Sequence, residues 1–141
     1  MNIRTLVITL AVSLMLSDAA SAEDDRLYRA FGGKDGIARI VEDFTSMALD
    51  DPRVSATFDE TSIPRFKEKL TLQLCELTGG PCVYDGLDMH AAHSGLDMTT
   101  ADFNAIVEIL QNAMNNHNIP FRTQNKLLKL LAPMKRDIVV E

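Results

Sequence analysis

Apolar residues recur at three- to four-residue intervals along most of this 141-residue chain, and this helical spacing constrains the fold more than any other feature. It predicts four substantial helices, over residues 34–49, 63–77, 99–114 and 120–138. A short helix over 24–31 precedes them, and 54–58 forms a turn or a single helical turn. No segment alternates apolar and polar residues as a half-buried strand does. The sequence therefore predicts an all-α fold in one domain.

Two local signals refine these helices. Thr99 followed by Asp102 is a variant of the capping box that starts a helix. Pro133 removes a backbone donor from the last helix and is expected to kink it near Lys129. The inner face of that helix is predicted to consist of Phe121, Leu127, Leu128, Leu131, Met134 and Ile138.

The composition limits both the size of the core and the class of partner. A chain of 141 residues with 46% hydrophobic residues supports a single core, which is mostly aliphatic because aromatic residues make up only 6%. The formal net charge is −6, whereas non-specific binding to DNA or RNA needs a basic face. A nucleic-acid partner is therefore not expected.

The first 22 residues have the pattern of a secretory signal peptide. Arg4 supplies the positive start, residues 6–16 form an apolar run, and Ala20-Ser21-Ala22 matches an A-x-A cleavage site. The run is too short for an ordinary transmembrane span, although an uncleaved anchor is the alternative. We expect cleavage after Ala22, export to the periplasm, no membrane attachment afterwards, and a mature domain over 23–141.

Export changes the interpretation of the two cysteines, Cys75 and Cys82. In an oxidising compartment, two cysteines in one small domain usually pair, and the residues between them leave room for a turn. A disulfide closing so short a loop stabilises the fold by about 2.5 kcal/mol. It would join the end of helix 63–77 to the loop that follows. Two free thiols are the alternative.

Two histidines, His90 and His93, lie in the segment 88–96, a short helical piece between glycine-containing turns. Haem iron requires a neutral imidazole nitrogen on a rigid element, with the second ring nitrogen donating to a neighbour. Small residues just before His93, at Ala91 and Ala92, would let a flat macrocycle approach. A lone histidine on a helix is more often a surface or satisfied polar residue. Both interpretations stay open on these residues alone.

Several short motifs occur in a fixed order along the chain: Gly32-Gly33, Val41-Glu42-Asp43-Phe44, Leu49-Asp50-Asp51-Pro52, Gly79-Gly80-Pro81, Tyr84-Asp85-Gly86, 89–95 and Leu131-Ala132-Pro133. In this order and spacing the chain resembles the truncated haemoglobins of group 1, and among them an exported variety with two cysteines. The resemblance covers nearly all of the mature chain. It implies a two-on-two helical sandwich around haem b.

The resemblance also assigns the cofactor site. It makes His93 the proximal ligand of the haem iron, with Met89 against the haem face, and leaves His90 on the surface. A propionate of the haem is expected to pair with Lys69, or with Arg65 or Lys67, and a solvated basic edge is the alternative. The residues expected to contact the cofactor are Phe44, Thr45, Phe66, Lys69, Leu70, Leu74, Met89, His93 and Met98.

The distal side departs from the family pattern. Thr45 stands where the family commonly has a tyrosine, and Leu70 where it commonly has a glutamine. Those two groups hydrogen-bond a bound gas ligand, which carries partial negative charge. Thr45 could donate weakly and Gln73 could turn inward. The favoured expectation is that Thr45 bonds its own helix and Gln73 faces solvent.

The resemblance implies a protein that binds O₂, CO or NO reversibly, of the oxygen-binding or transport type. An apolar distal pocket favours CO and NO over O₂ relative to relatives with tyrosine and glutamine. One alternative is a nitric oxide dioxygenase or a peroxidase-like haem enzyme, which would need a redox partner or polar distal groups. The other is a haem-free helical interaction module.

Overall fold

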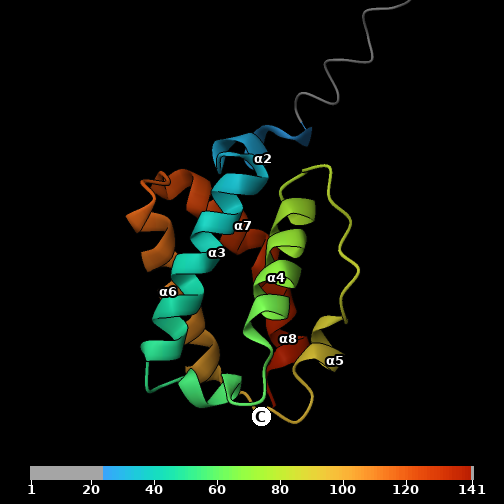
Figure 1. Ribbon diagram of the computed structural model, residues 1–141, viewed down its shortest axis with the longest axis vertical. Helices are drawn as coiled ribbons and strands as arrows, with labels where there is room; N and C mark the ends of the chain where they lie inside the picture. Colours follow the sequence, from blue (N-terminus) through green and yellow to red (C-terminus); the bar gives the residue numbers. More distant parts are fainter. Residues whose placement is uncertain (1–23, 141) are drawn as a thin grey trace, which may run out of the picture.

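The computed structural model describes residues 24–140, so the expected signal peptide over 1–22 lies outside the described residues. This part of the chain is helical and contains no strand (Figure 1). Its elements are α2 (Arg26–Ala30), α3 (Gly33–Asp50), η1 (Ser55–Phe58), α4 (Ile63–Leu77), α5 (Met89–Ala92), α6 (Thr100–Asn116), α7 (Phe121–Leu131), η2 (Ala132–Met134) and α8 (Lys135–Ile138). The all-α prediction is confirmed. Among these elements, no helix combines the length and hydropathy needed to cross a bilayer.

The helices form a two-on-two sandwich. α3 packs against α4 on one side and against α6 on the other, while α7 contacts α6 and α2 (Figure 1). The core lies where α3 meets α6 and α7, around the fully buried side chains of Ile37, Ile40, Met114 and Leu127. Each such burial stabilises the fold by about 1.5–3 kcal/mol relative to an exposed side chain. The core thus holds the long helices together. The face of α4 that does not pack against α3 remains open to the short elements.

The start of α6 confirms the predicted capping box. The Thr99 hydroxyl accepts from the backbone N–H of Asp102 at 3.2 Å, and the Asp102 carboxylate accepts from the backbone N–H of Thr99 at 2.9 Å. Two N–H groups that the helix cannot satisfy itself are therefore paired. This cap fixes where the chain leaves the short segment after α5.

The last helical segment differs from its prediction in two ways. Pro133 does not kink one continuous helix near Lys129, because the chain changes to the 3₁₀ turn η2 before continuing as α8. Phe121 is wrongly placed on the inner face, since its side chain is 69% exposed. Gln124 is buried instead, and its Nε2 donates to Asn115 Oδ1 at 2.7 Å and to the Ile119 carbonyl at 2.9 Å.

Cys75 and Cys82 form a disulfide, as expected. It joins the last turn of α4 to the loop that runs down the outside of the molecule to α5 (Figure 1). Gly80 between them cannot be replaced without movement, because a Cβ there would lie 2.5 Å from the Tyr28 ring and 2.6 Å from Cys75 Sγ. The loop is therefore held close to α2 and α4 at its start.

Candidate functional site

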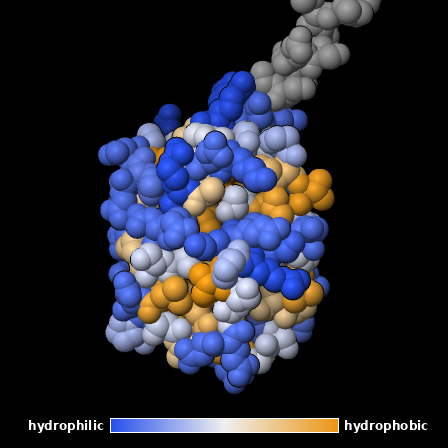
Figure 2. Space-filling model, viewed as in Figure 1, coloured by the Kyte–Doolittle hydropathy of each residue, from blue (hydrophilic) through white to orange (hydrophobic). Residues whose placement is uncertain are grey.

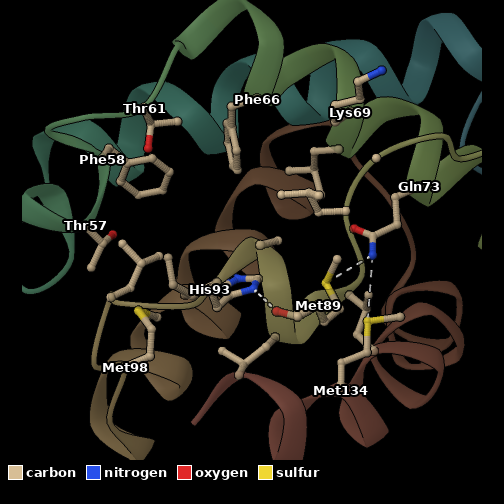
Figure 3. A pocket seen from close by; sticks show the side chains of 18 of the residues that line it. Thr57, Phe58, Thr61, Phe66, Lys69, Gln73, Met89, His93, Met98 and Met134 are labelled. Atoms are coloured by element: carbon tan, nitrogen blue, oxygen red, sulfur yellow. Dashed lines mark hydrogen bonds between the residues drawn. The ribbon is translucent and has the colours of Figure 1, made fainter. Parts of the chain in front are cut away.

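A cavity of about 570 Å³ lies between α4 and a layer formed by α5, α6 and the C-terminal elements (Figure 3). This volume is in the range of about 300–1,000 Å³ that is typical of cofactor and ligand pockets. α4 supplies Phe66, Leu70 and Leu74 to one wall, and the opposite wall includes Met89 and His93. The lining is predominantly apolar, so it suits a large, flat and apolar group.

His93 lies at the C-cap of α5 with its ring in the cavity (Figure 3). Its Nδ1 is 2.7 Å from the carbonyl oxygen of Met89. Because a carbonyl only accepts, Nδ1 carries the proton, and in the neutral ring Nε2 then keeps its lone pair. Asp88 caps the same turn, with Oδ1 accepting from the Ala91 N–H at 2.8 Å. The imidazole can therefore serve as a neutral metal ligand with a fixed tautomer.

The wall above His93 is aromatic and aliphatic. Phe66 packs edge-on against Phe58, with ring centroids 5.2 Å apart, and lies 6.4 Å from the Phe44 ring. Leu70 and Leu74 continue this surface along α4, and all five side chains line the cavity. These five side chains present only hydrocarbon to the cavity.

Thr45, predicted among the cofactor contacts, does not line the cavity. Its side chain is buried, and its hydroxyl donates to the Val41 carbonyl one turn earlier at 2.6 Å. A threonine inside a helix commonly satisfies its hydroxyl in this way. The expectation that Thr45 bonds its own helix agrees with this geometry.

Gln73 points into the cavity rather than to solvent, which corrects the favoured expectation (Figure 3). Its Nε2 donates to Met89 Sδ at 3.3 Å and lies 3.9 Å from Met134 Sδ. Gln73 follows Phe66 by seven residues and Leu70 by three, and these intervals place all three on one helical face. This spacing indicates an inward position for Gln73, although a polar side chain is normally assigned to solvent.

The mouth of the cavity carries cationic side chains. Lys69 Nζ pairs with Asp85 Oδ1 at 2.7 Å, and its stem lines the cavity together with Arg65. The hydrogen bond from Lys69 holds the pKa of Asp85 below its usual range, and the nearby charges of Lys69 and Arg65 act in the same direction. Lys67 is not at the mouth and pairs with Glu42 at 2.7 Å. Two of the three expected propionate partners therefore border the cavity.

The loop between α4 and α5 brings apolar side chains to the surface beside this mouth. Val83 and Leu87 are 74% and 63% exposed, and the Tyr84 hydroxyl donates to the Leu87 carbonyl at 2.6 Å. Figure 2 shows apolar patches at the right edge of this face, where the loop runs. His90 on α5 is exposed and does not line the cavity, as expected.

These residues fit the cofactor expected from the sequence. The cavity brings together Phe44, Phe66, Lys69, Leu70, Leu74, Met89, His93 and Met98, which is every expected contact except Thr45. Haem b needs one imidazole, apolar walls on both faces of the ring and cations near its carboxylates, and each is present here.

Comparison with known proteins agrees with the geometry. The family described as Bacterial-like globin matches residues 26–140. A group 1 truncated hemoglobin, GlbN of Mycolicibacterium paratuberculosis, is 28% identical over 124 residues, which is 88% of this chain and 91% of that protein. The group 1 truncated hemoglobin of Tetrahymena pyriformis is 27% identical over 113 residues, covering 80% of this chain and 93% of that protein.

Solved structures share the fold. The truncated hemoglobin of Tetrahymena pyriformis in its Fe(III) form superposes with a TM-score of 0.78 at 27% identity, covering 82% of this chain and 98% of that one. The 2/2 hemoglobin of Synechococcus sp. PCC 7002, solved in the cyanomet state with covalently attached heme, gives a TM-score of 0.75 at 24% identity. It covers 80% of this chain and 97% of that one.

Proposed function

The chain belongs to the bacterial-like globin family as a truncated haemoglobin, with haem b as its cofactor, and from this premise we propose that His93 ligates the iron. We further propose that the protein is exported and binds diatomic gases, and that its pocket favours CO and NO over O₂. Haem b supplies an iron with a coordination position for a gas such as O₂. The residues around the cavity decide how the cofactor is held and which gas is retained.

The hydrogen bond from His93 Nδ1 to the Met89 carbonyl is the observation that supports ligation. It fixes the tautomer and the orientation of the ring, which lines the cavity. No other histidine lines this cavity: His90 is exposed, and His117 lies beside Asp43 at 3.6 Å between Nε2 and Oδ2. His93 is therefore the residue we assign.

The apolar wall of α3 and α4 supports the ligand preference. Thr45 commits its hydroxyl to Val41, and Leu70 presents hydrocarbon where a glutamine is common in the family. Bound O₂ is stabilised by a hydrogen-bond donor more than CO is, because it carries more negative charge. Without such a donor at these two positions, O₂ leaves faster.

Lys69 and Arg65 at the mouth would hold the carboxylates of the cofactor. Their cationic groups are available to the two propionates, which would then lie near the loop that carries Asp85. Lys69 would then pair with a propionate in place of Asp85, or with both carboxylates at once. An ion pair of this exposed kind steers the cofactor more than it stabilises it.

Export is the part of the proposal that depends on the first 22 residues. The Cys75–Cys82 disulfide supports it, because disulfides persist in secreted and periplasmic proteins and are rare in the cytosol. Fractionation of cells producing the full chain, followed by N-terminal sequencing of the product, tests it. A mature protein starting at Glu23 in the periplasmic fraction is expected, and a cytosolic full-length chain would contradict export.

The proposal is tested by the optical spectrum of the mature protein with haem, ferric and then reduced, with and without CO. We expect a Soret band that CO shifts and that His93→Ala abolishes. His90→Ala is the matched control, because it removes an imidazole three residues away on the same helix. Retention of the same band in His93→Ala would overturn the assignment.

A further inference from the structure

α5 is weakly anchored for an element that carries a metal ligand. It has only four residues, and none of them is buried. Its contacts are with α8, and its first turn is capped by Asp88. Since burial of side chains normally holds a helix in place, the direction of the His93 ring must be set by other contacts.

Gln73 provides such a contact from the opposite wall. Its Nε2 atom meets Met89 Sδ at 3.3 Å and approaches Met134 Sδ at 3.9 Å, so one amide touches side chains from α5 and η2. Figure 3 shows Gln73 reaching down from α4 to both sulfur atoms along one side of the cavity. Within residues 24–140 this is the hydrogen bond that joins a side chain of α4 to α5.

Met89 accepts hydrogen bonds through both its side chain and its backbone. Its thioether accepts from Gln73, and its backbone carbonyl accepts from His93 Nδ1 at 2.7 Å and from the His93 N–H at 3.2 Å. A displacement of Met89 therefore moves the acceptor that orients the imidazole. The path from α4 to the ligand passes through one residue and two hydrogen bonds.

We propose that Gln73 is a positioning residue for His93, which holds Met89 and through it the orientation of the imidazole toward the iron. The inference rests on the proposed role of His93 as the ligand. A thioether is a weak acceptor, so the contact contributes little to global stability. Its effect is local, because second-shell partners fix the orientation of a ligating histidine.

The test compares Gln73→Leu, Met89→Leu and the double variant with wild type. Met47→Leu is the matched control: it makes the same thioether-to-aliphatic change at a residue outside the cavity, whose Sδ lies 3.9 Å from the side-chain amide nitrogen of Asn116 rather than that of Gln73. One readout is the iron–histidine stretching band of the reduced, gas-free protein by resonance Raman spectroscopy. The other is the rate of haem transfer to excess apomyoglobin.

Both single variants are expected to shift and broaden the stretching band and to lose haem about two- to tenfold faster. The double variant is expected to match the single ones, because each removes the same contact. Met47→Leu keeps the wild-type band. Urea unfolding of each apoprotein separates a local effect from a loss of fold, and Met89→Leu carries the test if Gln73→Leu does not fold.

Two results would overturn the inference while leaving the proposed function intact. One is a wild-type band and haem-loss rate in Gln73→Leu. The other is an unchanged band with faster O₂ release in Gln73→Leu, which would mean that Gln73 donates to the gas ligand. A wild-type protein whose haem band does not depend on His93 would instead refute the proposed function itself.

Discussion

His93 Nδ1 lies 2.7 Å from the carbonyl oxygen of Met89, four residues earlier in the chain, so the imidazole is oriented by the turn of helix that precedes it. The same turn is capped by Asp88 at its start. A ring held through one nitrogen leaves the other free for a metal. The site therefore depends on a local backbone contact more than on a large packed surface.

If Nε2 of His93 fills the axial position, a free imidazole can replace it. His93→Gly is expected to lose the Soret band of the reduced protein and to regain it when millimolar imidazole is added. His90→Gly serves as the control and keeps the band without imidazole. Rescue of both variants to the same extent would contradict the assignment of His93.

Leu70 offers the direct test of the gas preference. Leu70→Gln places an amide donor in the cavity and is expected to slow O₂ dissociation about ten- to a hundredfold, since a hydrogen bond to a charged acceptor contributes about 1.5–3 kcal/mol. CO dissociation should change far less. Leu70→Met, which alters the side chain without adding a donor, controls for shape. Flash photolysis and stopped-flow mixing measure both rates.

The Lys69–Asp85 pair predicts a dependence of stability on pH. Its hydrogen bond lowers the pKa of Asp85 from its usual 3.8 in the folded protein. The pair therefore stabilises the fold above the unfolded-state pKa, and the contribution is lost as the pH falls through the lower folded value. As the pH falls below about 4, Asp85→Asn is expected to reduce the pH dependence of the free energy of unfolding. High salt should weaken the difference, because the pair is solvent-exposed.

The sequence was sufficient to predict the main helices, because the apolar spacing agrees with the residues that begin and end helices along the chain. α4 has the predicted bounds of 63–77, between Pro64 in its first turn and Gly79 after its end. The position of His93 in a short helical piece also followed from the chain alone. These are local features, which a sequence encodes directly.

The side-chain role of Gln73 was harder to predict than that of Thr45, because its partners are not visible in the pattern. The hydroxyl of Thr45 bonds to Val41 within its own helix, as expected, and its side chain is buried. Gln73 finds its acceptors 16 and 61 residues away, at Met89 and Met134. A polar residue is assigned to solvent by default, and only the fold brings two thioethers to it.

Removal of the Cys75–Cys82 bond is expected to lower the free energy of unfolding, and this effect can be measured without changing a residue that lines the cavity. The loop-closure estimate for so short a loop is about 2.5 kcal/mol, so Cys75→Ala/Cys82→Ala is expected to lower the free energy of urea unfolding by that order. Wild type in excess dithiothreitol should behave like the double variant, whereas dithiothreitol should leave the variant unchanged. Because the bond fixes the start of the loop that leads to α5, haem should also be lost faster from the double variant and from wild type in dithiothreitol. Equal haem-loss rates with and without the bond would show that the loop is held by Gly80, Tyr28 and the Lys69–Asp85 pair instead.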